Sequence, residues 1–369
     1  MGVRQNENVV AGVHRGDPVR ALLHARRPRQ PRDTWARELY YDTRHEVHLS
    51  SLLAHGIYFL ASFLRIPLQF VPPIAGGFSA FVFFRILDKL FSDRTAASFL
   101  GILLYAGAVF HIVFLYDFIE NTCVSIPALM AFFYFAFGYM DAKGNGYDGG
   151  RLLPAAGMLG LAAAIHGMNA FLLPLLPAMV ILRRAPGRKW SVAVQECVTG
   201  FFGIAVLFVS SVGVMTLLGY DVIPGDIDGG GDDRFFVRFF GELQGYERFT
   251  AFSYKHFLEI ANIVGASLPL AWLIPFSPLR HDAYKAFAEQ PFNALTALGT
   301  MGFFAYIFLF NFDWGYSRDL DLMVAMGTPL LLFAIPLLIT LIKRPWIVLP
   351  VACIQIAATW YYVGSYLKP

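Results

Sequence analysis

The sequence predicts an all-α protein that crosses a membrane about ten or eleven times. Hydrophobic residues make up 57% of the 369 residues and charged residues only 15%, whereas a soluble domain carries roughly 25% charge. Apolar stretches of about 20 residues, the length that crosses a bilayer as a helix, recur to the end of the chain. Cys123, Cys197 and Cys353 lie far apart, which predicts small core residues rather than a disulfide or metal framework.

Residues 1–38 differ from the rest of the chain. They contain no sustained apolar run, and their second half is crowded with Arg26, Arg27, Arg29, Arg32 and Arg37. This composition is typical of a disordered or surface-associated arm. The sequence therefore divides into this Arg-rich arm and a transmembrane domain over residues 39–369, with a long extracytoplasmic loop at 219–254.

The first apolar helix is expected within residues 49–69. It follows the polar run Y-Y-D-T-R-H-E-V-H-L, ends near Pro67, and is short for a membrane span. Pro72 and Pro73 are expected to force a break before the next helix. Two readings stay open: a span, which places the arm in the cytoplasm, and an interfacial helix, which we favour.

Ten clear spans follow this helix. They are expected at about 76–92, 96–116, 122–140, 152–166, 168–182, 192–218, 255–276, 290–310, 319–342 and 346–366. The combined length of 152–182 suggests a tight helical hairpin around His166.

Clusters of basic residues predict the orientation of these spans. The clusters are Arg85, Lys89 and Arg94; Arg183, Arg184, Arg188 and Lys189; and Lys343 and Arg344. Short loops rich in Lys and Arg remain on the cytoplasmic side. Counting spans from them places the 219–254 and 311–319 loops on the opposite side, which predicts a multi-pass protein of the cell (inner) membrane with a polar site facing outward.

Four polar clusters are expected on this outward side. They are Asp42, His45, Glu46 and His48; Asp117, Glu120 and Asn121; His166; and Asp313, Arg318, Asp319 and Asp321. The last lies in N-F-D-W-G-Y-S-R-D-L-D-L-M, where aromatic residues alternate with charges as they do at the headgroup level. The alternative is a solvated loop with an acidic helix start.

The first and third clusters carry different expectations. Asp42, His45 and Glu46 share one face of a helix, so one carboxylate could take a proton from an acceptor hydroxyl while its neighbours tune its pKa or hold a divalent cation. The competing interpretation is an ordinary acidic helix start. For His166, a hydrogen-bonded packing role is favoured over a catalytic one.

Three stretches resemble the GT-C class of membrane glycosyltransferases, in particular bacterial members of the protein mannosyltransferase type. They are D-T-R-H-E-V-H-L before the interfacial helix, F-S-Y-K-H-F-L-E-I-A-N after the long loop, and N-F-D-W-G-Y-S-R-D-L-D-L-M. The likeness runs over most of residues 40–345. Enzymes of this class use sugars linked to polyprenyl phosphate.

The resemblance implies a catalytic carboxylate at Asp42 or, as second choice, Glu46. It implies polar residues at Asp117 and Glu120, and a cation near the donor phosphate, for which Arg318 is the candidate. The class begins with a span before its catalytic loop and carries a second aspartate there, and this chain has neither. These departures predict a start upstream of Met1 or a degenerate relative.

The leading hypothesis is an inverting glycosyltransferase that takes a sugar from a polyprenyl-phosphate donor to an unidentified acceptor (glycan, lipid or protein). The substrate-binding candidates that would orient sugar, acceptor or metal are His45, Asp117, Glu120, His166, Asp313 and Asp319. The cofactor is unknown, with Mg²⁺ or Mn²⁺ as candidates, and nucleic acid is not an expected partner. The alternatives are a transporter or lipid-sugar flippase, and a non-catalytic membrane assembly subunit.

Overall fold

The computed structural model describes most of the membrane domain. The described residues are 46–48, 52–91, 121–142, 144–183, 187–217, 221–223, 249–267, 289–309 and 327–341, with residues 99, 101, 104–105, 107–108, 237, 239–241, 285, 287, 350, 353–354, 356–357 and 361.

The described chain is a helical bundle, which confirms the predicted all-α, polytopic fold class. Four helices are long and apolar enough to cross a membrane: α4 (Val71–Leu90), α7 (Asn121–Met140), α10 (Trp190–Leu217) and α13 (Pro291–Leu309). Shorter apolar helices are α8 (Gly149–Ile165), α9 (Leu175–Leu182) and α15 (Gly327–Leu341). The bundle is completed by α3 (Leu52–Phe63), α11 (Tyr254–Ser267) and the 3-10 turns η3 (Leu68–Phe70) and η4 (Gly167–Leu172).

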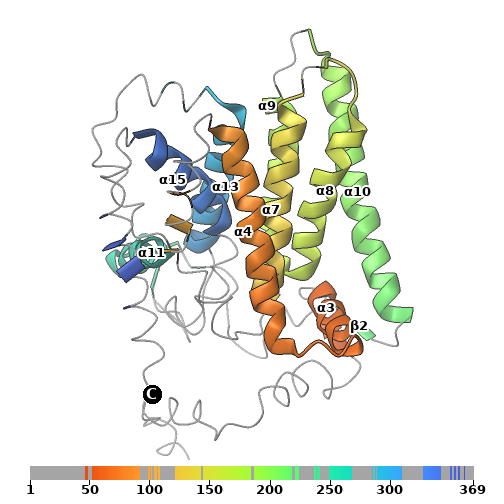
Figure 1. The fold of residues 1–369 in the computed structure, drawn as a ribbon, viewed down its shortest axis with the longest axis horizontal. Helices are drawn as coiled ribbons and strands as arrows, with labels where there is room; N and C mark the ends of the chain where they lie inside the picture. The colour runs from red at the N-terminus through yellow and green to blue at the C-terminus, as the bar shows by residue number, and fades with distance from the viewer. Residues whose placement is uncertain are drawn as a thin grey trace, which may run out of the picture.

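Helix α7 forms the centre of the bundle. It packs against α4 on one side and α8 on the other, while α10 lies outermost beyond α8 (Figure 1). Of the stretch of α7 that is long enough to cross a membrane, 72% is buried inside the protein, whereas the corresponding share for α10 is 17%. The α8–α10 contact depends on Gly160, because a Cβ there would lie 3.3 Å from the Ile204 side chain. Small residues allow membrane helices to approach this closely.

Helix α4 begins earlier than the sequence predicts. Pro72 and Pro73 lie inside its first turn rather than in a break before it. Proline is tolerated there because its missing N–H would have no partner in the first turn of a helix. The change of direction occurs instead at Arg65, which has a positive φ of 58°, and at η3.

Helix α3 has the length expected of an interfacial helix. Its 12 residues span about 18 Å, well short of the roughly 30 Å hydrocarbon core of a bilayer. It lies at the lower end of the bundle in Figure 1 and packs on α8 and α10. The Tyr58 hydroxyl lies 3.2 Å from the sulfur of Cys123 near the start of α7.

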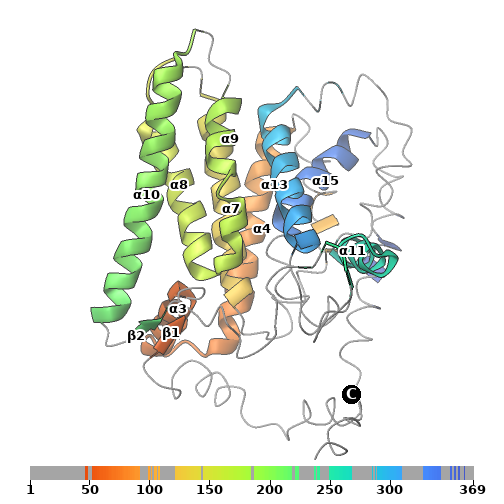
Figure 2. The same cartoon turned by 180° about the vertical axis from the view of Figure 1, so that it is seen from behind.

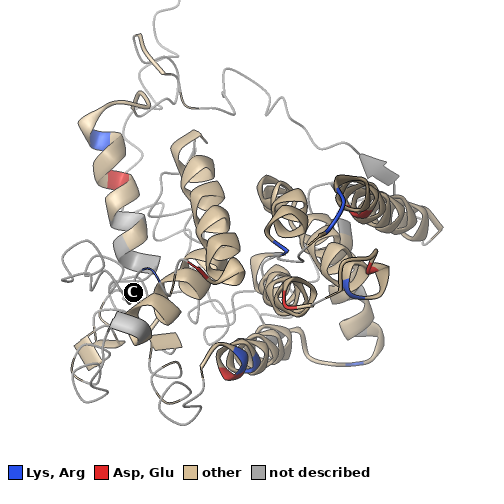
Figure 3. Cartoon of the chain, turned by 90° about the horizontal axis from the view of Figure 1, so that it is seen from above, with Lys and Arg blue, Asp and Glu red and all other residues tan. Residues whose placement is uncertain are grey.

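The described members of two predicted basic clusters lie at the same end of the bundle. Arg85, Lys89, Arg183, Arg188 and Lys189 all lie near the upper end of Figure 1, which Figure 3 views from above. The described parts of two predicted basic clusters are therefore together at one end, as the span count requires. That this end faces the cytoplasm stays a prediction.

The lower end carries two three-residue strands, β1 (Glu46–His48) and β2 (Asp221–Ile223), which the sequence analysis did not predict. They pair in parallel, and Figure 2 shows them beside α3.

Candidate functional site

The β1–β2 pair joins two segments that lie far apart in the sequence. Glu46 pairs with Asp221, Val47 with Val222 and His48 with Ile223. The described part of the acidic–histidine run, Glu46–His48, thus lies against the start of the long 219–254 loop. Glu46 is the described member of the predicted catalytic pair, while Asp42 and the neighbouring His45 lie outside the described residues.

The other predicted clusters adjoin helix ends that point toward the lower half of the bundle. Helix α7 begins at Asn121, directly after Glu120, and α13 ends at Leu309, just before the 311–319 stretch. His166 lies at the C-terminal end of α8. All three helix ends point to the lower end in Figures 1 and 2.

The remaining members of the predicted site lie outside the described residues, so their side chains have no described position. They are Asp117, Glu120, Asp313, Arg318 and Asp319.

The end of the long loop is fastened to the end of α13. The Val237 N–H donates a hydrogen bond to the Leu309 carbonyl at 2.8 Å. The His256 ring is fully buried between Phe249 and Phe308, with centroid distances of 4.5 and 5.1 Å. Stacking of this kind contributes about 0.5–1.5 kcal/mol per pair beyond the buried area.

A local hydrogen bond also fixes the His256 ring within its own segment. Its Nδ1 lies 2.7 Å from the Ala251 carbonyl, within the chain that leads into α11. The stretch F-S-Y-K-H-F-L-E-I-A-N, which carries part of the GT-C resemblance, is thereby held against the helix that leads to the N-F-D-W-G-Y stretch.

His166 acts as a cap in the turn between α8 and η4. Its backbone N–H donates to the Ala162 carbonyl at 3.0 Å, and its Nδ1 accepts a hydrogen bond from the Met168 N–H at 3.3 Å. Asn169 donates to the same Ala162 carbonyl at 3.0 Å. The side chain is 7% exposed. This geometry matches the packing role that sequence analysis favoured, and a role in binding substrate stays a prediction.

A buried ionic network at the upper end was not predicted from the sequence. The carboxylate of Glu196 on α10 accepts hydrogen bonds from the Tyr139 hydroxyl at 2.6 Å, the Asp148 N–H at 2.9 Å and Arg183 Nη1 at 2.9 Å. Arg188 Nη2 donates to the second carboxylate oxygen of Glu196. Glu196 is fully buried, and the Arg183 and Arg188 side chains are 1% and 8% exposed.

A signal for this network was present in the sequence. Glu196 is an acidic residue inside the predicted span 192–218, and an ionisable residue in a span has a partner or a function by default. Arg183 and Arg188 had been interpreted only as markers of orientation. The network joins the ends of α7, α9 and α10 and the turn before α8, so we assign it a structural role.

The chain matches no protein-family model, no curated protein and no solved structure in the comparisons made with them. Within the described ranges, no group of three or more His, Cys, Asp or Glu side chains is arranged to hold a metal ion. The expected Mg²⁺ or Mn²⁺ would depend on residues outside those ranges, such as Asp42, Asp313 and Asp319.

Proposed function

We propose that this protein is an inverting membrane glycosyltransferase that uses a polyprenyl-phosphate-linked sugar. What supports the proposal is that the described segments next to its predicted polar clusters lie toward the same half of the bundle. These segments are the strand that contains Glu46, the start of α7 after Glu120, the turn at His166 and the end of α13 before the 311–319 stretch.

The basic residues provide a second line of support. Loops at the opposite end carry Arg183, Arg188 and Lys189, and such loops stay in the cytoplasm. The polar clusters then face the extracytoplasmic side, where a sugar on a polyprenyl phosphate could reach them from the bilayer.

The chemistry assigns one task to each group. The acceptor hydroxyl oxygen attacks the anomeric carbon, the carbon–oxygen bond to the phosphate breaks, and polyprenyl phosphate leaves. Asp42 takes the hydroxyl proton as general base, and Glu46 is the second candidate for this role. Arg318 offsets the charge of the leaving phosphate, because a guanidinium pairs with two phosphate oxygens at once.

The remaining candidates orient the substrates. Asp117, Glu120, His166, Asp313 and Asp319 would hold sugar, acceptor or a divalent cation, with His45 beside the base. The fastening of the loop end onto α13 through His256 restricts the motion of this end, and positioning of reacting groups lowers a barrier even without new chemistry.

The test is transfer of a labelled sugar from a polyprenyl-phosphate donor in liposomes. Asp42→Asn removes the base and keeps the size of the side chain, so we expect transfer to fall by about 10²–10⁴-fold with normal expression. The control is Glu289→Gln, which also replaces a carboxylate by an amide, but at an exposed position near the opposite end. This variant should transfer sugar at the normal rate. Equal transfer by Asp42→Asn and the unchanged protein would remove Asp42 from the mechanism.

Arg318 is tested through donor binding. Arg318→Ala should weaken binding of the lipid-phosphate sugar, and Arg318→Lys should restore only part of it, because an ammonium cannot make the two-pronged contact. Absence of donor binding by the unchanged protein would favour the assembly-subunit hypothesis. Movement of the lipid-linked sugar across the bilayer without transfer would favour the flippase hypothesis.

A further inference from the structure

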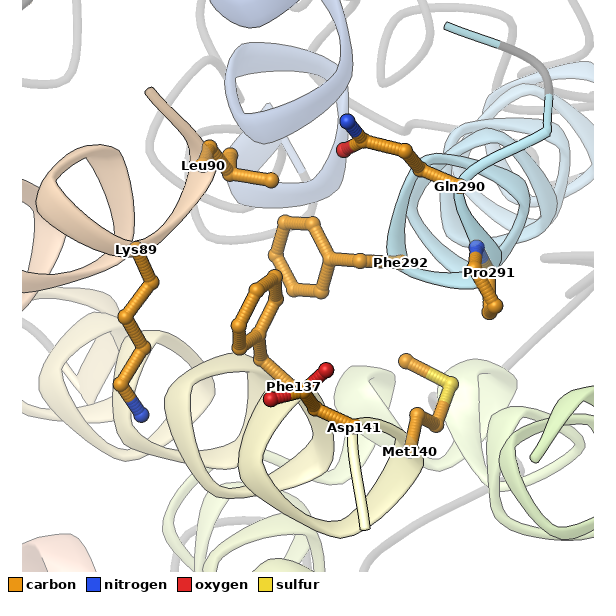
Figure 4. A pocket seen from close by; sticks show the side chains of 8 residues that line it. All are labelled: Lys89, Leu90, Phe137, Met140, Asp141, Gln290, Pro291 and Phe292. Carbon is orange, nitrogen blue, oxygen red and sulfur yellow. The ribbon is translucent and has the colours of Figure 1, made fainter. Parts of the chain in front are cut away.

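A cavity of about 380 Å³ opens at the upper end of the bundle, away from the proposed glycosyltransferase site. Figure 4 shows it between the end of α4, the end of α7 and the start of α13. Lys89, Asp141 and Gln290 supply its polar groups. Phe137 and Phe292 supply an aromatic wall, with ring centroids 5.1 Å apart in an edge-to-face arrangement.

The position of the cavity fixes its depth in a membrane. Helices α4, α7 and α13 are three of the four membrane-length helices, and Leu90, Met140 and Pro291 are their terminal residues at this end. A cavity lined by the last residues of three spans lies at the level of the lipid headgroups.

Two opposite charges line the cavity without neutralising each other. The Lys89 ammonium lies 3.9 Å from the centre of the Tyr134 ring and 5.5 Å from that of Phe137, which holds it by cation–π attraction. Over the described ranges, neither Lys89 nor the exposed Asp141 forms a salt bridge. A ligand that carries both a negative and a positive group would complement the pair.

The surface next to Lys89 is suited to acyl chains. Ile74, Phe78 and Phe81 are between 50% and 61% exposed on α4. At 100° per residue they share one face of the helix with Arg85 and Lys89, which follow them at its upper end. An exposed apolar stripe that ends in cations matches a phospholipid, with its chains along the stripe and its phosphate at the cations.

We propose that this cavity is a binding site for the headgroup of a zwitterionic phospholipid with a primary ammonium, such as phosphatidylethanolamine. Lys89 donates to the phosphate. Asp141 and the Gln290 carbonyl oxygen accept hydrogen bonds from the ammonium, and the Phe137–Phe292 wall excludes water on one side. A choline headgroup has no N–H to donate, and a glycerol headgroup has no positive charge for Asp141, so both should bind less well.

The test measures lipid binding to the purified full chain by native mass spectrometry, with phosphatidylethanolamine, phosphatidylcholine and phosphatidylglycerol of identical acyl chains. Phosphatidylethanolamine should bind about 5- to 10-fold more tightly than the other two. Lys89→Gln should weaken the binding of phosphatidylethanolamine by about the same factor, since a tenfold change in affinity corresponds to one charge-assisted contact of roughly 1.4 kcal/mol. Asp141→Asn should remove the preference over phosphatidylcholine.

Two controls make the result specific. Lys189→Gln removes an exposed cation directly before α10, outside the cavity lining, and Glu259→Gln removes a carboxylate on α11. Both should bind as the unchanged protein does. Equal affinity for the three lipids, or equal weakening by Lys189→Gln and Lys89→Gln, would overturn the proposal and indicate general attraction to lipid. The readout is binding, so it is independent of any sugar transfer.

Discussion

Replacement of Glu196 by alanine should be among the most destabilising single changes in this protein. Its carboxylate receives hydrogen bonds from Tyr139, Asp148, Arg183 and Arg188. The substitution leaves the buried Arg188 guanidinium without its anion, and of its ion pairs Arg183 keeps only the 3.7 Å contact with Asp148. Removing one partner of a buried ion pair costs about 3–5 kcal/mol.

The expected change in melting temperature follows from that cost. At about 2–4 °C for each kcal/mol, Glu196→Ala should lower the melting temperature by at least about 6 °C. The assay is thermal unfolding of the purified protein in detergent, followed by tryptophan fluorescence. The control is Arg151→Gln, because the 59% exposed Arg151 side chain lies at the edge of the network, 3.6 Å from Asp148. An exposed pair of this kind contributes about 0–1 kcal/mol.

A double variant separates loss of the ion pair from loss of packing. Glu196→Leu with Arg188→Met removes one anion and one cation, and Arg183 keeps its contacts with Asp148 and the Gly144 carbonyl. The double variant should be more stable than the sum of the single changes by roughly 0.5–3 kcal/mol. A Glu196→Ala protein that melts within about 2 °C of the unchanged protein would refute the argument that these charges depend on one another.

Three further predictions test orientation, the arm and close helix packing. A cysteine introduced at 183–190 should be labelled only from the cytoplasmic side and one at 228–232 only from outside; labelling of both from one side would overturn the orientation. Deletion of residues 1–36 should leave the melting temperature almost unchanged, since the segment has little apolar surface to bury, and a large decrease would show that it packs on the bundle. Gly299→Ala should destabilise the protein by about 1–3 kcal/mol, because its Cβ would lie 2.9 Å from a proline of α15. Gly157→Ala, with nothing within 4 Å of its Cβ, should be neutral or stabilising. Equal melting temperatures for the two variants would contradict this reasoning.

The long spans were predictable because each is an apolar run with polar residues at both ends. Expected spans at 122–140, 192–218 and 290–310 correspond to α7, α10 and α13 within a few residues. The hairpin at 152–182 was predictable from its length, since two short helices separated by a polar turn fit it. The position of each span therefore follows from the composition and length of its own apolar run.

Other features depend on residues distant in the sequence. The Glu196 network joins positions on four segments, and no local pattern shows that Tyr139 and Asp148 approach it. A strand of three residues is too short to show the alternation of polar and apolar residues that distinguishes a strand from a loop, so the β1–β2 pair was not predictable. Pro72 and Pro73 were expected to break a helix that they in fact begin, because proline is compatible with a first turn as well as with a break.

The sequence predicts the candidate site only as a set of clusters on one side, and the site stays a prediction. The described helix ends after Glu120, at His166 and before residues 311–319 point toward the lower half of the bundle (Figure 1). The roles of Asp42 and Arg318 rest on residue chemistry and on the resemblance. The cavity at Lys89 and Asp141 was not expected, because its polar groups come from three helices whose contacts the sequence does not show.

The β1–β2 pair also has a consequence for the order in which the protein assembles. Among the described elements, α3, α4, α7, α8, α9 and α10 separate its two strands in the chain. On a ribosome the segment around Glu46 emerges first, and its partner is made only after all of these helices. The strand pair at the proposed catalytic end therefore cannot form until α10 has been inserted. Contacts between segments distant in the sequence also form slowly. A nascent chain halted before residue 221 would carry the predicted catalytic run without the strand that positions it.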